Sequence, residues 1–367
     1  MQTSRHLVHV FPTFAVGGAQ IRFSQLAAAH GDRYHHTIIA LDGILDTVSL
    51  LSKQIVVKVV VPNFDKASGV RTLIRCRGIL NELKPGMLIT YNWGAMDWAL
   101  ANRCAPLAGH VHIEDGFGRE ENSRQFRRRV WLRRVALSGS HTRVIVPSQQ
   151  LERIAKDVWR LSSSATQYIP NGIDCSRFIH AASGRHRRSG PITVGTIATL
   201  RPEKNLARLI RAFAVVAANL PDDMLRLVIV GDGPERQNLE AAARASGRGK
   251  QILFVGPTKT PHLSLAEFDV FALSSDTEQM PLSVLEAMAA HLPVVSFAVG
   301  DLQNMVSEEN RCFVSTPLDD EESYHRCLHT LIFSRELRER LGAANQTRVQ
   351  ERFEQRLMVT RYAQLFG

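Results

Sequence analysis

Short β-branched runs alternate with longer amphipathic stretches along almost the whole chain. In the first half, runs typical of strands occur at 6–12, 35–41, 55–62, 87–93, 109–116 and 142–148. After a break the pattern restarts, with runs at 189–200, 224–230, 251–257, 269–275, 292–300 and 310–316. Strands separated by helices of this length indicate βαβ units and a parallel sheet. The pattern therefore predicts an α/β protein with two doubly wound, Rossmann-like domains.

The break between the two series is rich in Gly, Ser and Arg and has no clear period. We therefore predict an N-terminal domain, a linker, a C-terminal domain and a last helix that packs back toward the first domain, at 1–170, 171–190, 191–345 and 346–367. Two such domains facing each other would enclose a cleft at the carboxyl ends of their strands, where open α/β sheets bind ligands.

Composition is that of a globular protein: 367 residues, 44% hydrophobic and 22% charged. The five cysteines show no CxxC pair and no metal-ligand spacing, which is typical of reduced thiols. The start of the chain has no apolar signal-peptide core, and no run approaches the roughly 18 apolar residues of a membrane span. We expect a cytoplasmic protein, or one bound peripherally to the inner face of the plasma membrane.

The net charge of +10 suggests an anionic partner. Much of the excess lies in RQFRRRVWLRR, where Phe126 and Trp131 are interleaved with six arginines: Arg124, Arg127, Arg128, Arg129, Arg133 and Arg134. This stretch is either a solvated helix face or a basic, aromatic-bearing helix that lies on an anionic membrane. The stretch alone does not decide between these two interpretations.

Two strand-to-helix turns could hold a phosphate. Gly17 and Gly18 in GGAQ would let backbone N–H groups approach an anion at a helix start, although paired glycines are also common in ordinary turns. In TLRPEKN, Arg201 and Lys204 precede a helix, where cations are electrostatically disfavoured. Their presence there favours a bound diphosphate over simple surface charge.

The stretch GHVHIEDGFG gathers His112, Glu114 and Asp115 at the end of a predicted strand. One imidazole and two carboxylates at a strand's carboxyl end suit a polar ligand or a proton transfer. The alternative is a hydrogen-bonded loop with no chemical role.

Glu286 is the only residue with a full formal charge between Met280 and Phe297. Because a buried, unpaired charge is costly, a carboxylate in such apolar company indicates a purpose. Pro281 fits the first turn of a helix, so Met280 to Leu282 would present backbone N–H groups beside Glu278 and Glu286. Both carboxylates could border one site, since such groups accept hydrogen bonds from sugar hydroxyls.

Together these motifs resemble those of retaining glycosyltransferases with the GT-B fold, family 4. The resemblance covers nearly the whole chain and is strongest in SSDTEQMPLSVLEAMAAHLPVVSF, which is similar to the family's E-x7-E region. It recurs in YIPNGIDCSRF, IVGDGPER, LRPEKN and GGAQ. It implies a nucleotide diphosphate sugar as donor, transfer that keeps the anomeric configuration, and no metal or other cofactor.

The resemblance also implies roles for single residues. Glu278 resembles the acid that contacts the donor sugar, Glu286 the one that binds the ribose, and Lys204 the lysine that neutralises the leaving phosphate. Gly17 and Gly18 resemble the loop under the diphosphate, and the region at 258–259 resembles the base-binding segment. The donor-binding set that follows is Gly17, Gly18, Thr199, Glu278, Gln279, Met280, Pro281, Leu282 and Glu286.

Three positions depart from the family pattern. Thr199 stands where an arginine is usual, so Arg201 is the candidate to supply that charge. Gln279 stands where a glycine usually follows the first acid. The family's histidine has His112 as its one local candidate, with Glu114 or Asp115 as alternatives on the acceptor side, and Asp115 as a further candidate for proton transfer.

We expect transfer of a hexosyl unit to an acceptor hydroxyl, in the synthesis of bacterial surface polysaccharide, lipopolysaccharide or a lipid-linked glycan. Alternatives are a GT-B sugar-nucleotide epimerase and a non-catalytic sugar-nucleotide-binding protein. A nucleic-acid-binding protein is disfavoured, because only Phe126 and Trp131 accompany the basic residues.

Overall fold

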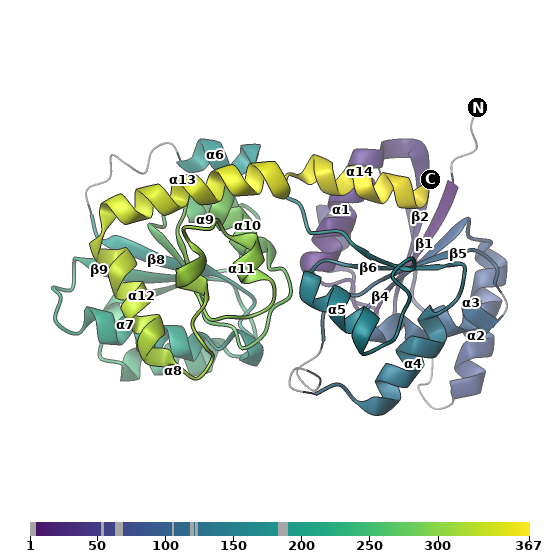
Figure 1. Ribbon diagram of the computed structural model, residues 1–367, viewed down its shortest axis with the longest axis horizontal. Helices are drawn as coiled ribbons and strands as arrows, with labels where there is room; N and C mark the ends of the chain where they lie inside the picture. The colour runs from purple at the N-terminus through teal and green to yellow at the C-terminus, as the bar shows by residue number, and fades with distance from the viewer. Residues whose placement is uncertain are drawn as a thin grey trace. The chain divides into compact units, whose positions relative to one another are not determined.

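The computed structural model describes residues 5–52, 55–62, 69–104, 106–117, 121, 124–182 and 190–367, with the backbone alone at 180–182. It divides into two compact units, Met1–Asn171 with Met358–Gly367, and Gly172–Leu357. Each unit is a parallel sheet covered by helices (Figure 1). Gly118 and the basic part of the expected linker, 183–189, lie outside the described residues.

The N-terminal unit holds a seven-stranded sheet in the order β3-β2-β1-β4-β5-β6-β7. Its strands are β1 Arg5–Phe11, β2 Tyr34–Ala40, β3 Val57–Val60, β4 Met87–Tyr91, β5 Gly109–Ile113, β6 Thr142–Val146 and β7 Thr166–Tyr168. Its helices are α1 Gly18–His30, α2 Gly69–Leu83, α3 Met96–Cys104, α4 Arg127–Leu137, α5 Gln149–Asp157 and, from Met358 on, α14 Gln355–Phe366. Most residues of the central strands are buried, because helices cover both faces of the sheet.

The two faces of this sheet have different cores. Helices α1 and α14 cover one face, where Phe11 and Tyr91 of the sheet pack with Phe23 of α1 and with Tyr362 and Phe366 of α14. Helices α2 to α5 cover the other face through two separate hydrophobic clusters, each with one buried tryptophan, Trp159 or Trp98. The last helix of the chain therefore completes the core of the first unit (Figure 1).

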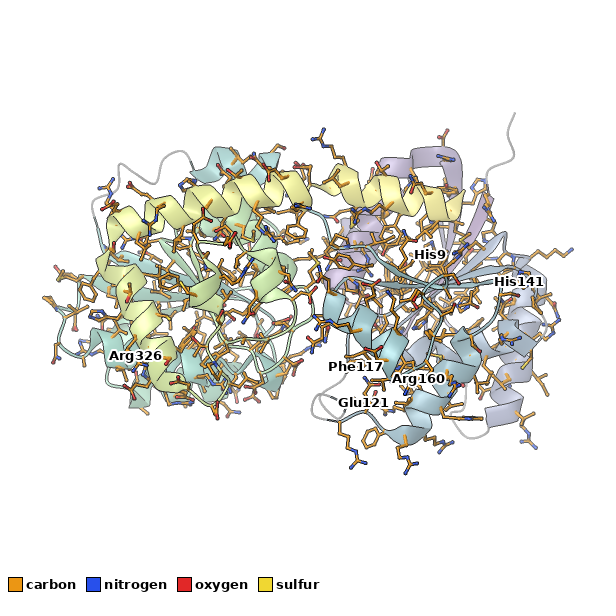
Figure 2. The ribbon with its side chains drawn as sticks, viewed as in Figure 1. His9, Phe117, Glu121, His141, Arg160 and Arg326 are labelled. Atoms are coloured by element: carbon orange, nitrogen blue, oxygen red, sulfur yellow. The ribbon has the colours of Figure 1, made fainter. Side chains whose placement is uncertain are left out.

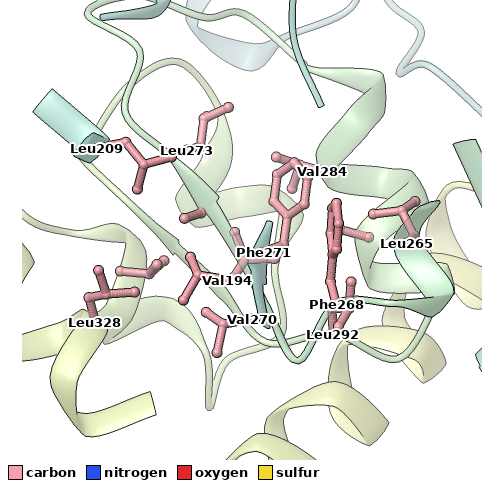
Figure 3. Close-up of a cluster of buried hydrophobic side chains, with 14 of the residues drawn as sticks. Val194, Leu209, Leu265, Phe268, Val270, Phe271, Leu273, Val284, Leu292 and Leu328 are labelled. Carbon is pink, nitrogen blue, oxygen red and sulfur yellow. The ribbon is translucent and has the colours of Figure 1, made fainter. Parts of the chain in front are cut away.

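The C-terminal unit holds a five-stranded sheet in the order β10-β9-β8-β11-β12. Its strands are β8 Ile192–Ile197, β9 Leu225–Val230, β10 Ile252–Gly256, β11 Val270–Leu273 and β12 Val294–Ser296. Its helices are α6 Ser176–Ala182, α7 Leu206–Ala217, α8 Arg236–Ala245, α9 Pro261–Ala266, α10 Leu282–Ala289, α11 Leu302–Met305, α12 Glu321–Phe333 and α13 Arg335–Arg352. Val194, Phe271, Val284 and Leu328 meet in its core (Figure 3).

Three segments differ from the sequence pattern. The run at 310–316 was predicted as a strand, but Arg311–Val314 is a 3-10 turn, with one bridge from Thr316 to Phe297. Part of the expected linker forms α6, which belongs to the second unit. The final helical stretch breaks at Phe353, because Ile173 N donates to Phe353 O and Ile173 O accepts from Gln355 N.

The arginine-rich helix α4 carries a buried ion cluster. Arg133 is fully buried and contacts the carboxylates of Glu114, at 3.3 Å, and Glu121, at 3.2 Å. Its guanidinium carbon lies 5.0–5.2 Å from the ring centres of three aromatic side chains, Trp93, Phe117 and Trp159. Phe117 and Glu121 are labelled beside α4 in Figure 2.

This burial corrects one part of the expected membrane surface. Arg133 was counted among the arginines that would face anionic lipid, but its charge is neutralised inside the unit by two carboxylates. Arg129, 28% exposed, also donates to Glu121. Of the six arginines, Arg124, Arg127, Arg128 and Arg134 are exposed.

We predict that Arg133→Ala lowers the free energy of unfolding of the N-terminal unit by about 3–5 kcal/mol, because two buried carboxylates lose their cation. The neighbouring, exposed Arg134→Ala should change it by less than about 0.5 kcal/mol. Urea unfolding followed by tryptophan fluorescence measures this unit directly, since all four tryptophans lie at 93, 98, 131 and 159. Equal midpoints for the two variants would contradict the structural role of Arg133.

Candidate functional site

An acid–cation pair stands at the carboxyl ends of two neighbouring strands of the second sheet. Lys204 ends a 3-10 turn that follows β8, and Glu278 lies in the loop that follows β11. Lys204 Nζ donates to Glu278 Oε1 at 2.6 Å, and Ser275 Oγ donates to the same oxygen at 2.7 Å. The side chains are 23% and 9% exposed, so the pair is sheltered yet reachable from solvent. Because β8 and β11 are adjacent, residues far apart in sequence meet here.

Helix α10 begins directly after this pair. Its N-cap position is Pro281, which offers no side-chain cap, and its first turn contains no acid. Backbone N–H groups at such a helix start favour an anionic ligand. The sequence prediction placed Met280, Pro281 and Leu282 at a helix start, and the structure does the same.

The backbone at Glu278 and Gln279 packs closely against a turn that contains Gly300. Gly300 has a φ of +55°, and a Cβ there would lie 2.4 Å from Glu278 O and 2.8 Å from Gln279 O. Asp301 N donates to Gln279 O at 3.0 Å. Only glycine fits this close approach, which fixes the path of the loop that carries Glu278.

Glu286 lies on α10, which packs against α6. It is partly buried, and no described side chain forms a hydrogen bond or ion pair with its carboxyl group. Burial raises the pKa of Glu286 to about 7, although Arg177 on α6 opposes the shift. The carboxyl group therefore titrates close to neutral pH when no ligand is bound.

Thr199 and Arg201 lie in the turn before Lys204, and both are exposed. Arg201 N donates to Thr199 O and Lys204 N donates to Arg201 O, so the turn is compact. The guanidinium of Arg201 makes no ion pair with any residue that the structure describes, which leaves its charge available to an anion. The backbone of Gly231 lies so close to the segment before this turn that a Cβ at Gly231 would be 1.9 Å from Ala198 O. Packing therefore requires a glycine at this position of the GDG loop.

The remaining predicted residues belong to the N-terminal unit. Gly17 and Gly18 stand at the start of α1, where no side chain caps the helix. Gln20 Nε2 donates to Thr13 O at 2.8 Å and closes the loop on itself. Gly17 lies between β1 and α1, as the sequence predicted, and Gly18 is the first residue of α1.

Asp115 is engaged by an arginine that the sequence did not single out. Arg22, 1% exposed on α1, donates to both carboxylate oxygens of Asp115 at 2.6 and 2.7 Å, and to Asn171 Oδ1 at 2.9 Å. Asp115 could therefore act as a proton acceptor only by giving up this pair. The sequence held a signal for this contact: Arg22 stands at helical spacing from Ala19 and Leu26, on the apolar side of the stretch, where a charge needs a partner.

His112 and Glu114 lie inside the N-terminal unit, both with no exposed surface. His112 Nδ1 is 2.8 Å from Thr90 Oγ1, and its Nε2 is 3.7 Å from Glu114 Oε2, which also contacts Arg133. In this conformation the pair cannot touch a dissolved substrate, and its position supports the alternative of a hydrogen-bonded structural cluster.

Two parallel α/β units are the architecture of the GT-B glycosyltransferase fold. Solved structures with this fold superpose over nearly the whole chain. Anabaena HepE with UDP and glucose gives a TM-score of 0.81 at 19% identity, covering 98% of this chain and 99% of that one. WaaG, a glycosyltransferase involved in lipopolysaccharide biosynthesis, gives 0.76 at 17% identity, covering 98% and 99%.

Family models assign both units. Residues 16–177 match the model Glycosyltransferase Family 4, and residues 181–348 match Glycosyl transferases group 1. The two matches cover one half of the chain each, and together with the superposed structures they support a GT-B group 1 glycosyltransferase.

Curated relatives are similar over shorter stretches. Sulfoquinovosyl transferase SQD2 of Arabidopsis thaliana is 30% identical over 51% of this chain and 35% of its own length. An Escherichia coli UDP-Gal:alpha-D-GlcNAc-diphosphoundecaprenol alpha-1,3-galactosyltransferase is 27% identical over 62% and 61%. The matched part spans about a third of the length of the first three curated relatives.

Among the described residues, no helix is both long and apolar enough to cross a bilayer. Within the same part of the chain, no three His, Cys, Asp or Glu side chains gather where they could hold a metal ion.

The raised pKa of Glu286 predicts a pH-dependent stability. Between its ordinary value of 4.5 and about 7, the folded chain binds more protons than the unfolded one, so stability falls as pH rises through this window. We predict that Glu286→Gln removes this loss and stabilises the ligand-free protein above pH 7 by up to about 3 kcal/mol. Denaturant unfolding of both proteins from about pH 5 to about pH 8.5, followed by circular dichroism, measures the difference.

An exposed glutamate of the same unit supplies the control. Glu336→Gln should leave the pH profile of the wild type unchanged, since Glu336 is exposed on α13. Parallel profiles for wild type and Glu286→Gln would show that Glu286 is an ordinary solvated carboxylate.

Proposed function

We propose that the protein transfers a hexosyl unit from a nucleotide diphosphate sugar to an acceptor hydroxyl, with retention of the anomeric configuration. The observation that carries this proposal is the Lys204–Glu278 pair beside the uncapped start of α10. It lies in the unit that matches the group 1 family. Relatives named as glucosyl-, mannosyl- and galactosyltransferases support the same reaction class.

In the proposed reaction the bond between the sugar's anomeric carbon and the diphosphate oxygen breaks, and the leaving diphosphate takes the electron pair. The acceptor oxygen bonds to the anomeric carbon on the same face, and its proton passes to the leaving phosphate. Lys204 and Arg201 would stabilise the charge that develops on the diphosphate, so that the chemistry needs no metal. The position of Lys204 at the strand ends and the unpaired charge of Arg201 support these roles.

Glu278 would accept hydrogen bonds from the donor sugar, and the backbone from Met280 to Leu282 would bind its phosphates. A bound diphosphate would then compete with Glu278 for Lys204, which frees carboxylate oxygens for the sugar hydroxyls. Glu286 would accept hydrogen bonds from two ribose hydroxyls, and these hydrogen bonds would favour the charged form of its carboxyl group. The segment at 258–259 would complete the contacts to the base.

We further propose a lipid-linked or surface-glycan acceptor and a peripheral position on an anionic membrane. Two relatives have names that contain lipid-linked sugars, one an alpha-D-GlcNAc-diphosphoundecaprenol and the other an alpha-monoglucosyldiacylglycerol. On α4 the aromatic side chains Phe126 and Trp131 are 48% and 60% exposed among the exposed arginines. Exposed apolar side chains beside arginines suit the interface between lipid headgroups and acyl chains.

Helix α2 extends the same kind of surface. Val70 and Ile74 are 72% and 66% exposed, and Arg71 and Arg75 are exposed between and beside them. Helices α2 and α4 both pack against α3 within one layer. Their outward side chains can therefore contribute to a single basic and apolar face of the N-terminal unit.

Turnover with a panel of UDP- and GDP-sugars, in the presence of bacterial envelope lipids, tests the proposed activity. We expect Lys204→Ala and Glu286→Ala each to lower turnover by about 100-fold or more while the protein stays folded, because charge stabilisation or donor anchoring is lost. Lys250→Ala, at an exposed lysine of the same unit, should keep full activity. The anomeric configuration of the product, read by NMR, tests retention.

Each alternative gives its own result. Product formed from the donor alone would identify an epimerase, and donor binding without turnover would identify a non-catalytic sugar-nucleotide-binding protein. Full activity of both Lys204→Ala and Glu286→Ala would remove the assigned site.

Flotation with phosphatidylglycerol-containing vesicles tests the membrane surface. We expect Arg127→Glu with Arg128→Glu, and separately Trp131→Ser, to reduce co-flotation, the first through lost attraction and the second through lost insertion. Arg326→Glu with Arg335→Glu, the same charge change on the second unit, should float as the wild type does. Equal recovery of wild type with neutral and anionic vesicles would contradict an electrostatic membrane contact.

A further inference from the structure

Arg208 is a mostly buried charge that none of the roles above uses. It lies on α7, one turn beyond Lys204, and is 9% exposed. The rest of the buried face of this helix is apolar, with Leu209 and Phe213 fully buried. A guanidinium at such a position requires partners, and these come from loops and strands far along the chain.

The partners of Arg208 belong to the loop that carries Glu278. Its Nη1 donates to Ser274 O at 3.4 Å, and its Nη2 is 3.0 Å from Asp276 Oδ1. Its guanidinium carbon lies 4.4 Å from the ring centre of Phe297, just after β12. On the far side, Nε is 3.4 Å from a carboxylate oxygen of Glu321.

The same loop is tied to the turn that carries Lys204. Asp276 N donates to Glu203 O at 2.9 Å, and Asn205 Nδ2 donates to Asp276 Oδ1 at 2.9 Å. Ser274 Oγ donates to Lys204 O at 3.1 Å. The two loops of the acid–cation pair are thus joined at Ser274 and Asp276, which are the two loop residues that Arg208 also holds.

We propose that Arg208 is a positioning residue that sets the geometry of the Lys204–Glu278 pair through Asp276 and Ser274. This inference rests on the proposed function for its effect on turnover, but not for its effect on the loop. Without the guanidinium, the Ser274 carbonyl and the Asp276 carboxylate lose their cationic partner, and residues 274–278 can move relative to Lys204. A misplacement of about 1 Å in an active site can lower a rate by about 100-fold.

Arg208→Met tests the proposal, because methionine keeps much of the apolar stem and removes the charge. The matched control is Arg211→Met on the same helix, since Arg211 also pairs with Glu321 but is 54% exposed and has no contact with residues 274–276 among its described partners. Hydrogen–deuterium exchange measures the loop directly. We expect faster exchange at 274–278, including the Asp276 amide, in Arg208→Met and wild-type exchange in Arg211→Met.

Turnover provides the second measurement. With the donor that the wild type uses, Arg208→Met should lower kcat by about 10- to 100-fold, and should change affinity for the matching nucleoside diphosphate by less than about threefold. A general loss of structure would lower both. Arg208→Lys should not restore kcat, because a single ammonium cannot contact Ser274 O and Asp276 while stacking on Phe297.

The two measurements separate the inference from the function. If the wild type transfers no sugar, the proposed function fails, while exchange at 274–278 still judges the positioning role. Unchanged exchange there in Arg208→Met, or equal effects in Arg211→Met, would overturn it. If Arg208→Met does not fold, Asp276→Asn replaces it: faster exchange at 274–278 supports the proposal, and wild-type exchange overturns it.

Discussion

The hydrogen bond between Lys204 and Glu278 depends on how the strands and loops of the second unit are packed. It joins the ends of β8 and β11, which only a parallel order of strands brings side by side. Gly300 packs closely against the backbone of Glu278, and Gly231 packs closely against the backbone just before the turn that carries Lys204. Each approach would be blocked by a single Cβ, so the pair depends on the packing of loops more than on any property of its two residues.

Buried charge is handled in two ways in this molecule. In the N-terminal unit, Arg22 and Arg133 are each matched by carboxylates inside the fold, which is the arrangement that a stable interior requires. In the C-terminal unit, Glu286 has no such hydrogen-bonded partner among the described residues, and burial raises the pKa of its carboxyl group against the opposing effect of Arg177. This contrast supports the proposal that a ligand supplies the missing hydrogen bonds to Glu286.

The sequence predicted much of this arrangement, because period and turn chemistry are local properties. Strands such as β1 and β8 and the helix start at Pro281 fall where alternation and proline placed them. Partner choice is not local. The pairing of Arg22 with Asp115 and the burial of Arg133 depend on residues that meet only after the sheet forms, so a count of charges along the chain could not separate Arg133 from Arg134.

The placement of α14 has a consequence for how the protein is made. Met358, Tyr362 and Phe366 belong to the aromatic core of the first unit, yet they leave the ribosome only after the whole second unit has been translated. The first unit to emerge therefore has α1 on that face of its sheet but lacks the part of the cover that α14 provides, while the second can close its own core. During synthesis the second unit would thus complete its core before the first unit does. The first unit would need a chaperone for longer, because its apolar surface stays exposed until α14 has been made.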